Sequence, residues 1–237
     1  MPIDISNNKI YKINYDEMYK EVGALHLFND SKIQSVYLNK WIEVLKQADD
    51  MSIKAYNDSS LRKNIIKENL EAPEIFQIQL IHNANTIYLH FRVSRILENI
   101  KRSGITEREA IEIPAEDFIK KNSYIIWTKT SDNVKMKKEP IVMVPLKTGL
   151  YHKMVVIDGN HRITDCINNR KKHVKAYQID GSGLVHNDLF ATAFDKMMYI
   201  FQNELIEVGT YTKMDDISAL ELIEKVFFST GELLRYC

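Results

Sequence analysis

The chain has 237 residues and carries 32 basic and 32 acidic side chains, so its formal net charge is zero. Hydrophobic residues make up 45% of it and charged residues 27%, the balance of a folded domain rather than a disordered one. Neutrality argues against a protein whose main role is to coat nucleic acid or an anionic membrane.

The first part of the chain, residues 1–104, is expected to be mainly helical. Apolar residues recur at helical spacing after Asp30 or Ser31, and either residue suits a helix N-cap. A second helix is predicted near residues 61–66. A long, mostly buried helix is predicted over residues 73–103, because proline suits a first helical turn and glycine the position after the last, and an interruption near residues 83–85 stays open.

The middle part, residues 105–182, changes its hydrophobic period. Short β-branched runs bounded by Pro, Gly, Asp and Asn predict strands there. The predicted strands are residues 111–113, 124–127, 141–144, 155–157 and 174–179. One helix, at about residues 162–170, lies among them. Short strands around a helix indicate an α+β fold class.

The last part, residues 183–237, is expected to be helical and to follow a linker at residues 181–183. Asn187 or Asp188 is the predicted cap of its first helix, and a second helix is predicted over residues 216–234. Both have apolar faces that suit packing against the core or against a second copy of the chain. We expect these flanks and the core to form one compact unit. Association of several copies into a homo-oligomer is a further possibility.

The location is expected to be a reducing cytoplasm. Only two cysteines occur, Cys166 and the terminal Cys237, which argues against a disulfide scaffold. No basic segment followed by an apolar run opens the chain, so we expect no signal peptide. No apolar stretch approaches the roughly 20 residues that span a bilayer, and we expect no membrane partner.

Residues 155–164 contain the highest density of side chains suited to ligand binding or catalysis. They read Val-Val-Ile-Asp-Gly-Asn-His-Arg-Ile-Thr, a short strand, a polar turn and the first turn of a helix. A helix start presents backbone N–H groups without partners and a partial positive charge, and both suit a phosphate. The plain alternative is a turn that serves only packing, with Asn160 as the N-cap.

The motif at residues 158–162, Asp-Gly-Asn-His-Arg, resembles the signature of the ParB/sulfiredoxin fold. The strands around it are similar too: residues 111–118 resemble the opening strand and its turn, residues 139–145 the strand before the motif, and residues 175–179 the closing strand. The similarity covers residues 105–182. It implies a ParB/sulfiredoxin-like mixed core flanked by N-terminal and C-terminal helical segments, with a phosphate-binding turn.

Each residue of this turn has an expected role. Gly159 lets the backbone approach a phosphate closely, and Arg162 is suited to bidentate bonds with its oxygens. His161 is suited to donate to phosphate or to move a proton. Asp158 is suited to orient the arginine or the turn, or to hold Mg²⁺ beside a nucleotide. Thr164 could offer a hydroxyl, although exposure to solvent is the plainer expectation.

Asn160 separates this chain from the sulfiredoxins. Those enzymes carry a catalytic cysteine at the position before the His-Arg pair, and an amide is no nucleophile. Cys166 does not replace it, because it lies more than one helical turn further on, on the apolar side. Sulfiredoxin activity is therefore not expected, and we place Asn160 among the nucleotide-binding residues.

The turn is most similar to the D-G-x-H-R branch of the fold, which includes free serine kinases. That branch uses the turn for nucleotide phosphates and a carboxylate from the early part of the domain as a base. Glu112, Glu116 and Asp117 are the candidates for this base, although such acids are more often solvated. We name Glu116, with His161, as the predicted catalytic residues. The implied cofactor is a nucleoside triphosphate, ATP or CTP, with Mg²⁺.

Other chemistry-bearing residues predict no further site. No Cys-x-x-Cys or His-Glu-x-x-His spacing occurs, so no metal site made by the protein alone is predicted. Lys147 follows a core strand, where a phosphate is within its reach, but a surface position is the plainer expectation.

Three functions stay open. The first is a phosphotransferase or nucleoside triphosphatase. The second is a non-catalytic module in which a nucleotide or other phosphorylated small molecule switches an interaction of the helical flanks. The third is a ParB-like DNA-processing accessory protein or nuclease, with a basic patch from residues 135–138 and 170–172. Nucleic acid is the less favoured partner, because residues 187–237 carry nine acidic against four basic side chains.

Overall fold

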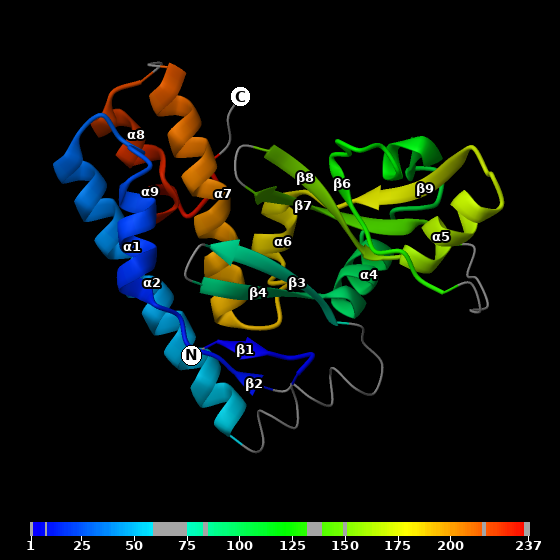
Figure 1. Ribbon diagram of the computed structural model, residues 1–237, viewed down its shortest axis with the longest axis horizontal. Helices are drawn as coiled ribbons and strands as arrows, with labels where there is room; N and C mark the ends of the chain where they lie inside the picture. The colour runs from blue at the N-terminus through cyan, green and yellow to red at the C-terminus, as the bar shows by residue number, and fades with distance from the viewer. Residues whose placement is uncertain are drawn as a thin grey trace. The chain divides into compact units, whose positions relative to one another are not determined.

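The computed structural model describes residues 2–7, 9–58, 75–82, 85–131, 139–148, 151–214 and 217–234 (Figure 1). The chain divides into two compact units, one made of Met1–His90 and Phe190–Cys237 and the other of Phe91–Leu189. Both contain helices and strands, so the α+β class is confirmed. The expectation of one compact unit is wrong. Within the described ranges, no helix is both long and apolar enough to cross a bilayer.

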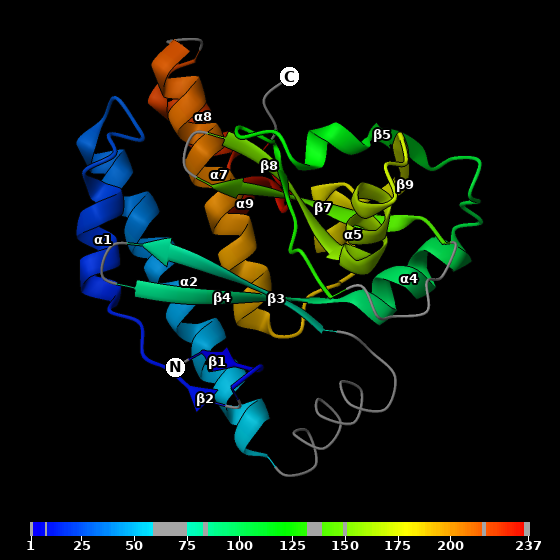
Figure 2. The same ribbon diagram turned by 45° about the vertical axis from the view of Figure 1, so that its right-hand side comes forward.

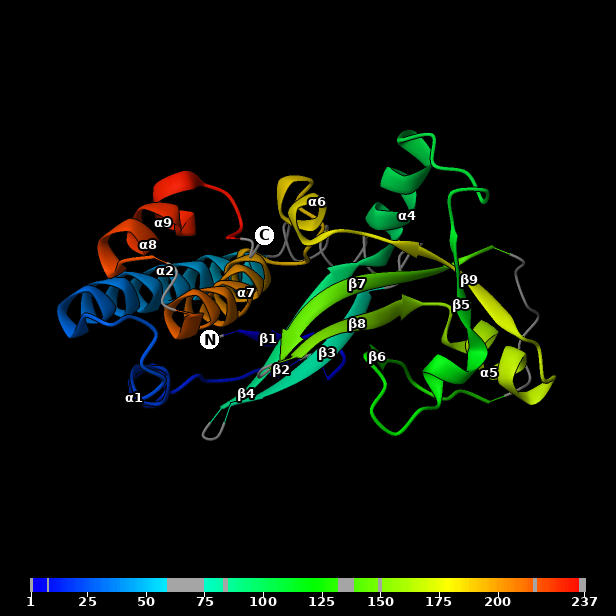
Figure 3. The same ribbon diagram turned by 90° about the horizontal axis from the view of Figure 1, so that it is seen from above.

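A pair of long helices forms the centre of the first unit, α2 (Ser31–Asn57) packed against α7 (Ala193–Met214) (Figures 1 and 3). Asp30 is the N-cap of α2, as predicted: its Oδ1 accepts hydrogen bonds from the backbone N–H groups of Lys32 and Ile33. These bonds satisfy two of the donors that a helix start leaves open. The other helices that the structure describes in this unit are α1 (Tyr15–Gly23), α8 (Ala219–Lys225) and α9 (Phe227–Thr230).

A wholly buried carboxylate joins three of these helices. Glu204 Oε1 on α7 accepts hydrogen bonds from Tyr37 Oη and Trp41 Nε1 of α2, both at 2.9 Å. Its Oε2 accepts the backbone N–H of Phe227 at the start of α9. Burial raises the pKa of Glu204 and its three hydrogen bonds oppose that shift. The single helix predicted over residues 216–234 is instead α8 and α9, which the extended backbone of Val226 separates.

The long helix predicted over residues 73–103 is wrong. Strands β3 (Ile75–His82) and β4 (Asn85–Arg92) form a two-stranded sheet, and of the residues described in this range only those of α4 (Val93–Arg102) are helical (Figure 2). Buried Ile87, Leu89 and Phe91 recur at every second position of β4, which is the period of a strand. A second short ribbon pairs β1 (Ile3–Asp4) with β2 (Lys9–Ile10). The helix predicted near residues 61–66 and the basic run 135–138 lie outside the described residues.

A chain of polar side chains crosses the first unit. His90 is 1% exposed, with Nδ1 2.9 Å from Asp195 Oδ1 and Nε2 2.8 Å from Gln77 Oε1. The Gln77 amide donates to Asp4 Oδ1 through Nε2, and its Oε1 accepts the N–H of Ser6, so both neighbours support this orientation of the amide. Both ring nitrogens of His90 therefore face side-chain oxygens, one on α7 and one on β3.

The second unit contains a five-stranded mixed sheet in the order β5-β9-β7-β8-β6. Its strands are β5 (Ile111–Pro114), β6 (Ile125–Ile126), β7 (Ile141–Thr148), β8 (Tyr151–Asp158) and β9 (His173–Gln178). β7 and β8 are antiparallel, whereas β9 runs parallel to β7 and antiparallel to β5. All five predicted core strands are present, and β7 and β8 are longer than expected.

Helix α5 (Asn160–Asn168) connects β8 to β9 and contacts the 3-10 helix η1 (Ala115–Phe118). Its Ile163 and Cys166 are buried in a core with residues of β5, β7, β8 and β9. Cys166 thus lies on the apolar side of the helix, as expected. This packing fixes the start of α5 against the sheet.

The linker predicted at residues 181–183 is wrong, because α6 (Gly181–His186) begins there. Asp180 caps this helix, its Oδ1 accepting the N–H of Gly183 at 2.9 Å, and Leu184 and Val185 are buried. Capping and burial outweigh the low helix propensity of glycine. Asn187 is the C-cap of α6 rather than the start of the next helix.

Candidate functional site

The strand-to-helix corner at residues 158–162 is built around Gly159. This residue is the N-cap of α5, with φ 103° and ψ 16°, in the left-handed region that favours glycine. A Cβ at this position would overlap the side chain of Ile141 and lie 3.0 Å from Arg162 Nε. Glycine is therefore required both by the backbone and by the close approach of β7. Asn160 is the first residue of the helix and not its cap.

The Arg162 guanidinium makes its bonds inside the fold. Its Nη2 lies 2.6 Å from Asp158 Oδ2, and its Nη1 donates to the carbonyl oxygens of Glu139 and Pro140. The Arg162 side chain is 14% exposed and that of Asp158 18%. These contacts attach the first turn of α5 to the start of β7. A phosphate that used this guanidinium would compete with the Asp158 carboxylate.

The segment 128–131 is bound to the same end of α5. Asn160 Oδ1 accepts the N–H of Thr128 at 2.8 Å. Thr164 Oγ1 accepts the N–H of Thr130 at 3.1 Å and donates to the Asn160 carbonyl at 3.0 Å. Thr164 is 2% exposed, so the expectation that its hydroxyl faces solvent is wrong. Both side chains hold the loop in place.

His161 is the exposed side chain of the motif. Its Nδ1 lies 3.4 Å from the Ser131 carbonyl, a long contact, and the residue is exposed to solvent. Among the described residues, the backbone N–H groups of Asn160, His161 and Arg162 have no hydrogen-bond partner. The accessible chemistry of the corner therefore consists of three backbone donors and one imidazole.

The structure does not bring Glu116 and His161 together. Glu116 lies in η1, is 71% exposed and pairs with Lys120 at 3.3 Å. It lines a shallow hollow with Ile167 and with residues 170–173, which follow the carboxyl end of α5. A nine-residue helix is about 13 Å long. Glu116 and His161 therefore lie toward opposite ends of α5.

The corner does not fit a metal ion held by the protein alone. Among the described residues, no three His, Cys, Asp or Glu side chains gather as a metal site. Asp158 is paired with Arg162, so of its expected roles it orients the arginine, and its carboxylate is not open to Mg²⁺. Any Mg²⁺ at this corner would have to be coordinated mainly by the phosphates of a nucleotide.

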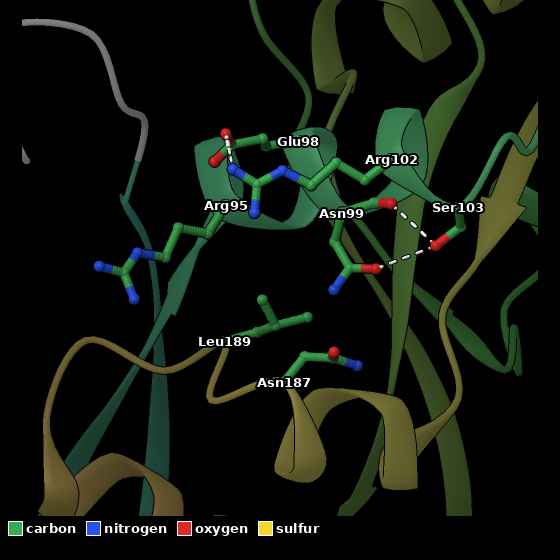
Figure 4. A pocket seen from close by; sticks show the side chains of 7 residues that line it. All are labelled: Arg95, Glu98, Asn99, Arg102, Ser103, Asn187 and Leu189. Atoms are coloured by element: carbon green, nitrogen blue, oxygen red, sulfur yellow. Dashed lines mark hydrogen bonds and ion pairs between the residues drawn. The ribbon is translucent and has the colours of Figure 1, made fainter.

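A hollow of about 550 Å³ lies on α4, a site that sequence reasoning missed (Figure 4). Its polar lining consists of Arg95, Glu98, Asn99, Arg102, Ser103 and Asn187. The positions 95, 99 and 102 share one helical face, which was the available signal. That signal was hidden because residues 73–103 read as one buried helix.

Lys147 and His152 are direct cross-strand partners of β7 and β8. Burial lowers the pKa of Lys147 to about 8. It also lowers the pKa of His152, and the charge of Lys147 lowers it further. Lys147 is half-buried, so the expectation of a surface lysine is wrong.

Comparison with family models, with curated proteins and with solved structures found no match to this chain. A function must therefore be argued from the geometry of the chain itself.

Proposed function

We propose that this chain binds a nucleotide or another phosphorylated small molecule at the amino end of α5, on a ParB/sulfiredoxin-like core. The observation that carries the proposal is the corner at Gly159. A left-handed glycine starts a nine-residue helix whose first three N–H groups lack acceptors among the described residues, with the exposed His161 beside them. Such donors and the helix dipole favour a dianion, and the imidazole adds another donor.

The order of the elements supports the family resemblance. β7 and β8 precede the motif, α5 carries it, and β9 follows and returns to the same sheet. The mixed five-stranded sheet keeps this order over residues 111–178, the part of the chain where the resemblance lies.

The motif residues have two different roles, phosphate contact and positioning of the turn. The backbone donors and His161 contact the phosphate, whereas Asp158 and Arg162 position the turn, as do Asn160 and Thr164 through the loop at 128–131. ATP or CTP would bring Mg²⁺ with its phosphates, since Asp158 is occupied by Arg162.

Binding without turnover is the better-supported form of this function. The candidate base Glu116 lies toward the far end of α5 and is paired with Lys120. A non-catalytic nucleotide-switched module therefore ranks above a phosphotransferase or triphosphatase.

Titration calorimetry with ATP and with CTP, each with Mg²⁺, tests the proposal. His161→Ala should weaken binding about three- to tenfold, the effect of one hydrogen bond. Lys172→Ala, beyond the other end of α5, is the control and should change nothing. Chromatography of the nucleotide after incubation measures turnover separately. If neither nucleotide binds, or both variants bind as the wild type does, the proposal is wrong.

A further inference from the structure

The shallow hollow beside η1, at the carboxyl end of α5, is partly apolar. Its volume is about 530 Å³, and its apolar lining consists of Pro114, Ala115, Ile119 and Ile167. Ile119 is 61% exposed, although it directly follows the buried end of η1. An apolar side chain of a partner would remove this surface from water.

Uncompensated positive charge borders this apolar lining. Arg170 and Lys172 line the hollow, are exposed, and make no ion pair or side-chain hydrogen bond with any described residue. The other charges of the lining are already compensated, because Glu116 and Lys171 are each paired with a neighbour of opposite charge. Arg170 and Lys172 are therefore available to an anionic partner.

The backbone of Arg170 is strained. This residue follows the C-cap of α5 and has a φ of 52°, in the left-handed region. Its N–H donates to the Ile167 carbonyl and that of Lys171 to the Cys166 carbonyl, the helix-ending pattern in which this position is usually glycine. An arginine kept in place of glycine points to a use for its side chain.

Helix α8 presents the complementary chemistry. Its Leu220 is 70% exposed, the highest value of any large apolar side chain among the described residues. Glu224 lies one turn further along the same face, is exposed, and has no partner among the residues that the structure describes. An apolar side chain next to a carboxylate matches an apolar lining next to two cations.

The two units carry opposite net charges. Of the 32 basic and 32 acidic side chains of the chain, residues 91–189 contain 18 and 12, which leaves 14 and 20 for the other unit. The formal charge is therefore +6 for the second unit, which contains the hollow, and −6 for the first, which contains α8. Two copies of the chain attract one another where the first unit of one meets the second unit of the other.

We propose that α8 of one copy of this chain docks into the hollow beside η1 of a second copy, with Leu220 on the apolar lining and Glu224 beside Arg170 and Lys172. The contact joins two different surfaces, so it closes into a ring or continues as a filament. It is centred on a seven-residue helix and is small beside the roughly 1,200 Å² of a stable interface, so the association is weak and reversible. It uses no residue of the corner at Gly159 and does not depend on a nucleotide.

Sedimentation velocity of the full chain over a hundredfold range of concentration tests this proposal. The wild type should associate as its concentration rises, and less at high salt, because salt screens attraction between exposed charges. Leu220→Asp and Arg170→Glu should each weaken the association at least tenfold. Adding Glu224→Lys to Arg170→Glu should restore most of it, since both charges of the contact are then reversed. Lys101→Glu reverses an exposed charge of the same unit outside the hollow and should have less than a twofold effect.

Two further measurements separate the contact from an effect on folding. Arg170→Gly removes the guanidinium but suits the left-handed backbone, so it should lose the association and melt no lower than the wild type. Arg170→Gly and Leu220→Asp should each stay monomeric alone. Their mixture contains one intact hollow and one intact α8 face, and it should form dimers.

Four results would overturn the proposal. The wild type sediments as a monomer at every concentration; Lys101→Glu weakens association as much as Arg170→Glu, which indicates diffuse attraction between the units; or neither the charge reversal nor the mixture restores association, which places the contact elsewhere. The fourth is that a short DNA duplex or an acidic peptide binds the monomeric wild type and not Arg170→Glu. The hollow would then belong to a different partner.

Discussion

His90 holds the N-terminal ribbon, β3 and α7 together through two buried ring contacts. In His90→Leu, the Asp195 carboxylate and the Gln77 amide would each lose one buried hydrogen bond to the imidazole, although both keep their other partners. Breaking a buried pair of this kind costs about 3–5 kcal/mol. Urea unfolding measures the loss, and His152→Leu, which replaces an exposed histidine, should cost less than about 0.5 kcal/mol. A loss below about 1 kcal/mol for His90→Leu would contradict the role of this contact.

Lys147 makes the free energy of unfolding change with pH in the alkaline range. Burial lowers its pKa from 10.5 to about 8, so the folded chain holds this proton less tightly than the unfolded chain does. The group therefore destabilises the fold below pH 8, and this penalty fades as the pH rises from about 8 toward 10.5.

Lys147→Met removes the charge and keeps an unbranched side chain that is one heavy atom shorter. We expect it to gain about 1 kcal/mol at pH 7, a figure reduced because the residue is only half-buried, and to gain little at pH 10. Urea unfolding at both pH values, as the difference from wild type, measures this. Lys175→Met, which changes an exposed side chain of β9, should show no such pH dependence. A gain from Lys147→Met that is equal at both pH values would argue against a buried charge.

Arg162 stabilises the fold as well as shaping the candidate site. Arg162→Ala would remove the bond to Asp158 and those to the Glu139 and Pro140 carbonyls, at a cost of about 2–3 kcal/mol. Arg162→Lys should recover only part of this, because an ammonium cannot reproduce the planar fork. Chemical denaturation of both variants checks the order. If Arg162→Ala is as stable as the wild type, Arg162 does not stabilise the fold, and its expected role as a phosphate ligand is favoured.

At the scale of elements, the sequence predicted the core better than its flanks. The strands β5 to β9 were predictable because their β-branched runs end at Pro, Gly, Asp or Asn. The hairpin at residues 75–92 was not, because His90 is buried beside Phe91 and interrupts the simple alternation of faces. A buried polar residue whose partner lies more than a hundred positions away, as Asp195 does, cannot be recognised locally.

The candidate site was predictable in its backbone and in the orienting of Arg162 by Asp158, but not in its other contacts. Gly159 at a strand-to-helix corner follows from local rules. The pairing of Arg162 with Asp158 competes with ligand binding. The two further bonds of the guanidinium, to the carbonyl oxygens of residues 139 and 140, depend on where β7 begins and cannot be inferred from the local sequence. Nothing in the sequence indicates which end of α5 lies beside Glu116, since that depends on where η1 packs.

Gly159 is the element-scale test of how α5 begins. Gly159→Ala should cost more than about 2 kcal/mol, because it combines a left-handed φ with overlap of the Ile141 side chain. Gly104→Ala is the matched control: its φ of 69° is also left-handed, but a Cβ there meets nothing within 4 Å, so about 1 kcal/mol is expected. Thermal and urea unfolding compare the two. Equal losses would mean that the packing of β7 against the corner contributes nothing.

At the scale of the whole molecule, the second unit is inserted into the first between His90 and Phe190. At the junction, each unit has a backbone hydrogen bond of its own that joins the two chain segments entering and leaving it. The N–H of Arg92 donates to the Leu189 carbonyl at 3.0 Å in the second unit, and the N–H of Ala191 donates to the His90 carbonyl at 3.1 Å in the first. Each unit therefore has adjacent ends, the arrangement in which excision and closure are tolerated best.

We expect each unit to fold without the other. A chain in which a short Gly-Asn turn joins His90 to Phe190 should keep Trp41 buried, because closing so short a loop costs little entropy. The excised segment of residues 91–189 should keep the partly buried environment of Trp127, which packs on the core of the second unit. The two tryptophans of the chain report on one unit each, so emission maxima and cooperative urea transitions follow them separately. A blue-shifted maximum and a single transition in both fragments are the expected results. Solvent-like emission from Trp127 in the excised segment would mean that the second unit depends on the first to fold.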